Sequence, residues 1–161
     1  MGAVIRYLRE LPTTKSARDV SRHPGYEKRG IDIVHVTHGG VTTTIDVKGD
    51  RYPERNFFFE SWSVAEERIE GCLLTSEADF WYYLFLQTGI GYVLPVPATR
   101  AWFRTSIATR RLPFPEKDVP NNDPEKGRYT TKGYPVPISL VERELKDAGV
   151  APLRVSLRHL L

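Results

Sequence analysis

Residues 30–48 constrain the fold most, because they read as two β-branched strands joined by a Gly39-Gly40 turn. The stretch is Gly-Ile-Asp-Ile-Val-His-Val-Thr-His-Gly-Gly-Val-Thr-Thr-Thr-Ile-Asp-Val-Lys. Valine, isoleucine and threonine favour strands, and a glycine pair between two such runs is typical of a tight hairpin. Side chains alternate faces along a strand, so Asp46 and Lys48 share one face and their apolar neighbours share the other. The sequence therefore predicts a hairpin with one apolar face and one charged face.

An antiparallel hairpin with this turn brings a second carboxylate close to the first. Residue 33 is expected to pair roughly with residue 46, which places Asp32 within about a residue of Asp46. Two close carboxylates can hold a divalent cation such as Mg²⁺, and a nearby Lys48 ammonium can polarise water and offset charge. Asp-x-Lys is nevertheless a common tripeptide, and surface strands carry ion pairs routinely. The residues alone leave a structural role open.

Composition indicates one ordinary globular domain spanning residues 1–161. The chain has a formal net charge of +3 and a pI near 9.0, which weakly favours a polyanionic partner. Cys72 is the only cysteine, so an intrachain disulfide and a cysteine-based zinc site are excluded. The sequence lacks both a secretory signal and a run of ~20 apolar residues that would span a bilayer. We expect a soluble cytoplasmic protein with no membrane partner.

Further elements are expected on both sides of the hairpin. Aromatic residues with Glu60 among them predict a strand over 56–62, and a carboxylate there requires either an open edge or a polar site. Ser76, Asp79 and Gly89 carry the start and stop signals of a helix over 76–87. The remaining expectations are a strand over 91–96, a helix over 98–111, a long flexible loop over 112–128, and a helix from 139 to about 149.

The expected helix over 98–111 carries a row of arginines. Arg100, Arg104 and Arg111 are spaced by four and seven residues, which places them on a common helical face. Such a face is either simply solvated or a surface that contacts DNA phosphates. Both interpretations stay open from the sequence.

The wider sequence around the hairpin resembles the PD-(D/E)XK nuclease superfamily. The resemblance rests on the pattern Asp32 … Asp46-Val-Lys48, together with its sequence context. That context comprises Asp-Val-Ser at 19–21, Tyr-Glu-Lys-Arg-Gly-Ile-Asp at 26–32, Asn-Phe-Phe-Phe-Glu at 56–60, and Gly-Cys-Leu-Leu-Thr-Ser-Glu-Ala-Asp at 71–79. The stretch from 17 to 96 looks like a phage and bacterial branch of that superfamily.

The resemblance implies an α/β fold with a restriction-endonuclease-like core, in which α-helices flank a mixed central β-sheet. It further implies catalytic roles for Asp32, Asp46 and Lys48. Mg²⁺, for which Mn²⁺ can substitute, would be held by the two carboxylates and the carbonyl of Val47. Asp19, Glu27 and Glu60 are candidates for an additional acid, and Glu10 competes with Asp19.

The function implied by the resemblance is Mg²⁺-dependent hydrolysis of DNA phosphodiesters. A junction-resolving or other structure-selective endonuclease, acting on branched DNA in phage replication, recombination or repair, is the specific expectation. Because a symmetric junction needs two cuts, we expect a homodimer. The alternatives are a restriction- or repair-type nuclease, a catalytically silent DNA-binding module of the same fold, and an accessory protein that does not contact nucleic acid.

Overall fold

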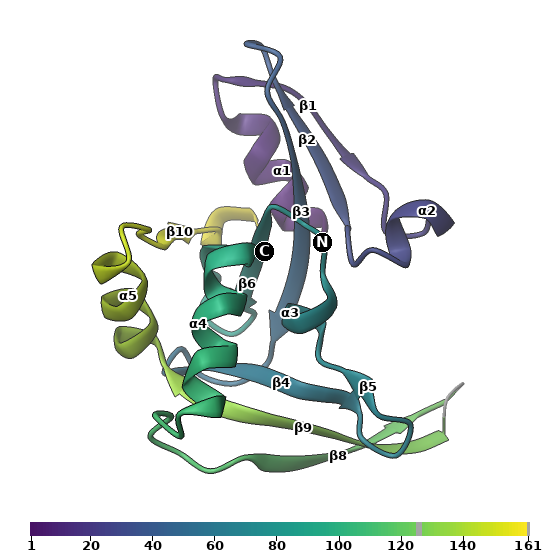
Figure 1. The fold of residues 1–161 in the computed structure, drawn as a ribbon. Coiled ribbons are helices and arrows are strands. Elements are labelled where there is room, and N and C mark those ends of the chain that lie inside the picture. Colours follow the sequence, from purple (N-terminus) through teal and green to yellow (C-terminus); the bar gives the residue numbers. More distant parts are fainter. Residues whose placement is uncertain (125–126, 161) are drawn as a thin grey trace.

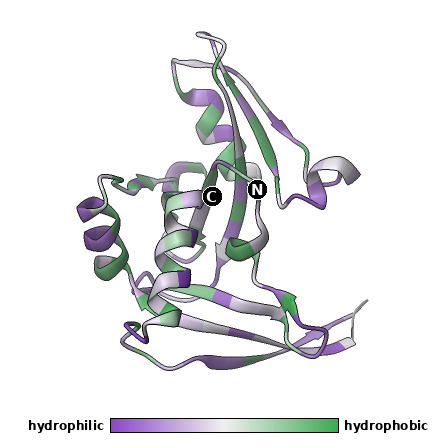
Figure 2. Cartoon of the chain, in the orientation of Figure 1, coloured by the Kyte–Doolittle hydropathy of each residue, from purple (hydrophilic) through white to green (hydrophobic). Residues whose placement is uncertain are grey.

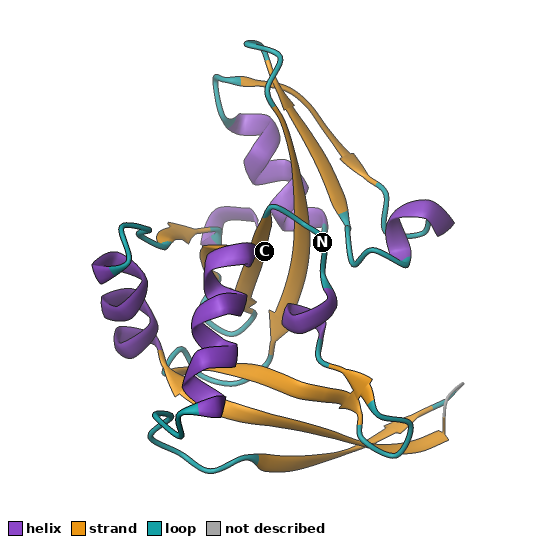
Figure 3. Ribbon diagram, in the orientation of Figure 1, coloured by secondary structure: helices purple, strands orange, loops and turns teal. Residues whose placement is uncertain are grey.

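The computed structural model describes residues 1–124 and 127–160, which form two β-sheets and several helices (Figures 1 and 3). In chain order the elements are α1 (Gly2–Glu10), β1 (Thr14–Asp19), α2 (Pro24–Glu27), β2 (Ile33–Thr37), β3 (Thr42–Asp50), β4 (Asn56–Val64), β5 (Ile69–Glu70), α3 (Cys72–Thr75), β6 (Phe80–Phe85), β7 (Ile90–Pro95), α4 (Val96–Ala108), β8 (Lys117–Asp123), β9 (Gly127–Pro137), α5 (Ile138–Asp147), β10 (Leu153–Ser156) and the 3₁₀ turn η1 (Arg158–Leu160). No described helix has the length and apolar character needed to cross a bilayer.

The predicted hairpin is the start of a mixed six-stranded sheet. The strand order is β1-β2-β3-β6-β7-β10, and all neighbours are antiparallel except β3 and β6, which run parallel. Ile33 pairs with Ile45, one residue away from the pairing expected from the sequence. Gly40 takes a φ of +81° in the turn, a backbone conformation that favours glycine. The expected mixed α/β architecture is confirmed at this level.

Both faces of the six-stranded sheet are covered. On one face, α1 packs Val4, Ile5 and Leu8 against a cluster that includes Ile33 and Ile45. On the other face, α3, α4, α5 and β4 contribute to a larger aromatic cluster. Helices α1 and α5 show separate hydrophobic and hydrophilic sides, as expected for helices that cover a core (Figure 2). The apolar and charged faces predicted for β3 therefore meet different environments.

The predicted helix over 76–87 is wrong, because residues 80–85 form the central strand β6. Trp81, Tyr83 and Phe85 enter the larger cluster, while Tyr82 and Leu84 enter the cluster under α1. A strand buried on both faces reads as a continuous apolar run and lacks the alternation that identifies a half-buried strand. Asp79, which has the sequence features of a helix cap, has a different structural role.

Asp79, expected to cap a helix, joins β3 to β6 instead. Its Oδ2 accepts hydrogen bonds from the Thr44 N–H at 2.7 Å and from the Thr44 hydroxyl at 2.8 Å. The Asp79 N–H donates to the Thr44 carbonyl at 3.1 Å. These bonds anchor the parallel register in which Asp46 lies beside Trp81.

A second, four-stranded antiparallel sheet has the order β5-β4-β9-β8 and lies across one end of the first (Figure 1). The expected strand over 56–62 is confirmed as β4. The predicted flexible loop over 112–128 is wrong where it overlaps β8 and the start of β9, and residues 125 and 126 lie outside the described residues. β8 is an edge strand, and edge strands tolerate a proline such as Pro120. Its composition therefore resembles that of a loop.

Candidate metal centre

Asp32 lies immediately before β2, on the face of the sheet opposite to Ile33. Its backbone N–H donates to the Ile45 carbonyl at 2.9 Å, which continues the β2–β3 pairing. Its Oδ2 accepts the Val47 N–H at 2.8 Å. Burial raises the pKa of Asp32, the bond from Val47 opposes the rise, and the Asp19 charge adds to it. The side chain is therefore held against the backbone between Asp46 and Lys48.

Asp46 is the most perturbed carboxylate of this region. Only 8% of its surface is exposed. Burial raises the pKa of Asp46 to about 7, and the charges of Asp32 and Glu60 add to the rise. The neighbouring Ser76 hydroxyl and the Lys48 ammonium act to lower the pKa. Strand alternation places the Asp32 side chain on the same face of the sheet as Asp46, and Asp32 Oδ2 contacts the N–H of Val47, the residue after Asp46.

The Val47 carbonyl faces the same place. In a strand, the N–H and C=O of one residue point toward the same neighbouring strand. Because the Val47 N–H donates to Asp32, its carbonyl also points to the Asp32 side of β3. β2 pairs with β3 only as far as Ile33, so this carbonyl lies beyond the paired part of β2. The Val47 carbonyl and the Asp32 carboxylate therefore lie on the same side of β3, at the residue that follows Asp46.

This donor set fits Mg²⁺ in its chemistry. Mg²⁺ prefers oxygen ligands, and proteins commonly supply one or two carboxylates while water and substrate phosphate complete the octahedron. The raised pKa of Asp46 reflects crowded negative charge, which a divalent cation would relieve. Over residues 1–124 and 127–160, no cluster of three or more His, Cys, Asp or Glu side chains has the arrangement of a metal site. The fit therefore rests on two carboxylates and a backbone oxygen.

Lys48 reaches across to the second sheet. Its Nζ forms an ion pair with Glu60 Oε1, and the other carboxylate oxygen of Glu60 accepts the Ser63 hydroxyl at 2.7 Å. Glu60 is only 7% exposed. Burial acts to lower the pKa of Lys48, but the charge and hydrogen bond of Glu60 and the charge of Asp46 oppose it and leave the pKa raised. Lys48 is therefore a fixed ammonium group beside Asp46.

The backbone around Glu60 explains how a carboxylate enters this site from an aromatic strand. The β4–β9 register shifts between Glu60 and Trp62, and such a bulge re-aims side chains. Gly71 lies directly against this backbone, and a Cβ there would overlap the Glu60 carbonyl. Of the two expected environments for Glu60, the structure has the polar site.

The other candidate acids lie farther from Asp46 or are engaged elsewhere. Asp19 ends β1, and its Oδ1 accepts the Ser21 N–H at 3.0 Å and the Ser21 hydroxyl at 2.7 Å. These bonds lower the pKa of Asp19, whose charge still reaches Asp32. Glu27 is exposed on α2. Glu10 contacts His159 at 3.2 Å.

Sequence reasoning missed the contributions of Ser63 and Ser76, and it placed Cys72 only as a packed residue. The Cys72 thiol lies near the charges of Glu60, Lys48 and Asp46, and burial raises its pKa far above the usual range. It is therefore a neutral thiol that lines the site and not an activated nucleophile. Single hydroxyls and thiols have no spacing signature, so only the fold brings them here.

The arginines of the predicted 98–111 helix have other partners. α4 spans Val96–Ala108, so Arg111 lies beyond its end and the expected three-residue face does not form. Arg100 donates from Nε to the Leu73 carbonyl at 3.0 Å and from Nη2 to the Ser76 carbonyl. Arg104 is exposed and approaches the Leu74 carbonyl at 3.5 Å. Arg100 thereby ties α4 to α3.

Comparisons of the chain with protein-family models, with curated proteins and with solved structures find no match.

Proposed function

We propose that this protein is a Mg²⁺-dependent DNA endonuclease of the PD-(D/E)XK type. The observation that carries the proposal is the placement of Asp32, Asp46 and Lys48 on one face of a mixed sheet, with the Asp32 carboxylate hydrogen-bonded to the Val47 N–H between the other two residues. The helices that cover both faces of this sheet support a restriction-endonuclease-like core. Branched DNA is the proposed substrate, and a homodimer that makes two cuts is the proposed form.

In the proposed reaction, water adds across one P–O bond of a phosphodiester, which gives a phosphomonoester and a hydroxyl group. Asp32, Asp46 and the Val47 carbonyl would hold Mg²⁺, which supplies positive charge to the phosphoryl oxygens and acidifies bound water. Lys48 places its ammonium where it can hold the attacking water or a phosphoryl oxygen. Strand β4 keeps that ammonium in position through Glu60.

The direct test is cleavage of labelled four-way junction, duplex and single-stranded DNA by the purified protein, with Mg²⁺ or with EDTA. We expect cleavage only with Mg²⁺, and faster cleavage of the junction than of the duplex. Mn²⁺ should restore activity after EDTA treatment. A protein that cuts none of the three DNAs at any Mg²⁺ concentration would contradict the proposal.

Glu60 is proposed as a positioning residue for Lys48, because its carboxylate joins that ammonium to Ser63. Glu60→Gln should lower kcat roughly 10- to 100-fold, since small displacements of a catalytic group are costly. KM and the stabilisation of the fold by Mg²⁺ should stay near the wild-type values. If Glu60→Gln abolishes the stabilisation by Mg²⁺, Glu60 is a metal ligand and the positioning role is wrong. Glu60→Asp tests partial rescue of kcat.

The ion pair of Lys48 favours one alternative, a catalytically silent DNA-binding module. A lysine engaged by a buried carboxylate is less free to meet substrate than an unpaired one. The same cleavage experiment separates the two functions when DNA binding is measured in parallel. Salt-dependent binding without cleavage would favour the silent module.

A further inference from the structure

The positive charge of the chain is concentrated at its N-terminal end. Residues 1–30 contain seven Lys and Arg residues and three Asp and Glu residues, a net charge of +4. The other 131 residues contain 16 and 17, a net charge of −1. A local excess of one sign attracts a polyanion even when the whole protein is only weakly charged.

Several of these cations are exposed and unengaged. Lys15, Arg18 and Lys28 are exposed, and within the described part of the chain none of them forms an ion pair. Arg29 pairs with Glu77 at 2.7 Å, but both side chains are about half exposed, and such surface pairs contribute little. Arg100, in contrast, already donates to two backbone carbonyls.

The strand register places Arg18 on the same face as Asp46. Arg18 pairs with Val34, which pairs with Thr44, and directly opposed residues share a face of the sheet. Asp46 is the next residue of β3 on that face. Two steps between strands and two residues along β3 separate the Arg18 and Asp46 Cα atoms by about 12 Å. An extended Arg18 guanidinium can therefore contact a phosphate within about three nucleotides of the one bound at a metal ion on Asp46.

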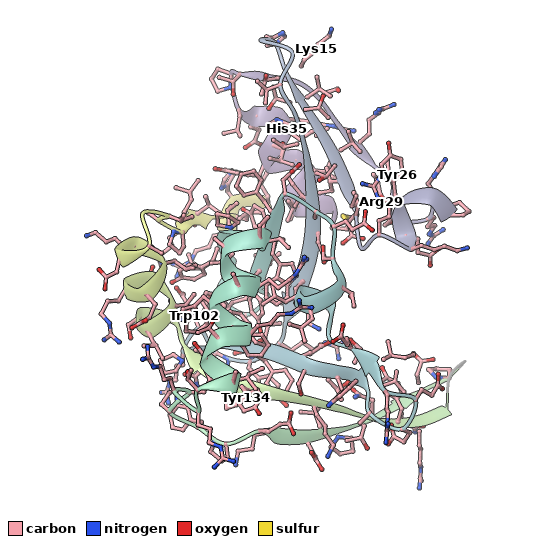
Figure 4. The ribbon with its side chains drawn as sticks, in the orientation of Figure 1. Lys15, Tyr26, Arg29, His35, Trp102 and Tyr134 are labelled. Carbon is pink, nitrogen blue, oxygen red and sulfur yellow. The ribbon has the colours of Figure 1, made fainter. Side chains whose placement is uncertain are left out.

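The segment that follows α2, residues 28–30, also lies near the candidate metal centre. The Ser76 hydroxyl, which neighbours Asp46, donates to the Gly30 carbonyl at 3.0 Å. The Glu77 N–H donates to the Arg29 carbonyl at 2.7 Å. Lys28 and Arg29 thus directly precede a backbone contact to the edge of the site. Figure 4 shows Arg29 beside α2 and Lys15 near the end of β1 that lies away from α2.

We propose that Arg18, Lys28 and Arg29 form a basic surface that binds the DNA backbone on one side of the scissile phosphate. This inference rests on the proposed nuclease function and assigns its phosphate-binding surface to β1 and the α2 segment in place of α4. The contacts are to phosphates, so they position DNA without reading its sequence.

The test is a double charge reversal, Arg18→Glu with Lys28→Glu, in the full chain. Binding of a fluorescent 30-base-pair duplex and of a four-way junction is measured in EDTA over a range of NaCl concentrations. We expect Kd to rise at least about tenfold near 0.1 M NaCl. The slope of log Kd against log salt should become shallower by about 2, because two phosphate contacts are lost.

The matched control is Arg143→Glu with Lys146→Glu on α5, which makes the same change in net charge. α5 lies on the opposite side of the molecule from α2 (Figure 1), and both of its side chains are exposed. This control should change Kd less than about threefold. If the two double variants weaken binding equally, the basic surface is wrong while the nuclease proposal stands. If wild-type protein binds neither DNA, both proposals fail.

Discussion

Asp46→Asn and Lys48→Ala are each expected to reduce Mg²⁺-dependent DNA cleavage by about 10²- to 10³-fold or more. Asp46→Asn removes the negative charge that would bind Mg²⁺ together with Asp32. Lys48→Ala removes the only ammonium group that the described structure places against Asp46 and Glu60. Losses of this size correspond to about 2.7 to 4 kcal/mol of transition-state stabilisation. Single-turnover cleavage of a labelled four-way junction measures them directly.

Asp147→Asn is the matched control for the carboxylate change, because Asp147 is exposed on α5 and far from the site. It should cleave at the wild-type rate. Circular dichroism and thermal unfolding establish that the inactive variants are folded. Equal cleavage by wild type, Asp46→Asn and Lys48→Ala would mean that the activity belongs elsewhere or to a contaminant.

The second large effect is on stability, and it follows from the pKa of Asp46. Its pKa is about 7 in the folded protein, whereas an ordinary aspartate has 3.8. A raised pKa means that the folded state binds the proton more tightly than the unfolded state does. The contribution to stability is therefore complete below about pH 4 and is lost as the pH rises toward 7 and above. Between pH 5 and 8 the metal-free fold should lose roughly 2 to 3 kcal/mol through this group.

Urea denaturation in EDTA at pH 5 and pH 8 tests this linkage. The asparagine side chain does not titrate, so the difference between the two pH values should be smaller in Asp46→Asn than in wild type by roughly that amount. At pH 8 the metal-free variant should be more stable than the metal-free wild type. The same pH dependence in both proteins would show that Asp46 has an ordinary pKa.

Addition of Mg²⁺ should reverse part of the effect. The cation binds ionised carboxylates, so it should stabilise the wild-type fold more at pH 8 than at pH 5. Mg²⁺ at 100 times its Kd should raise the free energy of unfolding by about 2.7 kcal/mol. Asp46→Asn should lose most of this stabilisation, which separates metal binding from catalysis.

The local part of the site is readable from the sequence. The Gly39-Gly40 turn and the alternation of side chains determine that Asp46 and Lys48 share a face. They also bring Asp32 close to Asp46 along the hairpin, but the expected pairing was one residue off, and a shift of one residue moves a side chain to the other face of the sheet. The shared face of Asp46 and Lys48 depends only on close neighbours in the chain, so composition and period are sufficient to predict it.

The sequence pattern did not identify two of the strands, β6 and β8. β6 is apolar on both faces because it is the strand between β3 and β7, so its period of two is hidden. β8 is polar and contains Pro120 because it is an edge strand. Position within a sheet decides both patterns, and that position is a property of the whole fold.

The hairpin sequence by itself therefore determined that Asp46 and Lys48 share one face, whereas the observed register, in which Ile33 pairs with Ile45, decided that Asp32 joins them. Only the tertiary structure decided which segments and side chains pack against that face. The packing of distant segments buries Asp46 and raises its pKa, and it brings Glu60 of β4 to Lys48 through a bulge that no local pattern encodes. The physical reason is that burial and ion pairing depend on which distant segment covers a strand, whereas alternation depends on the strand alone.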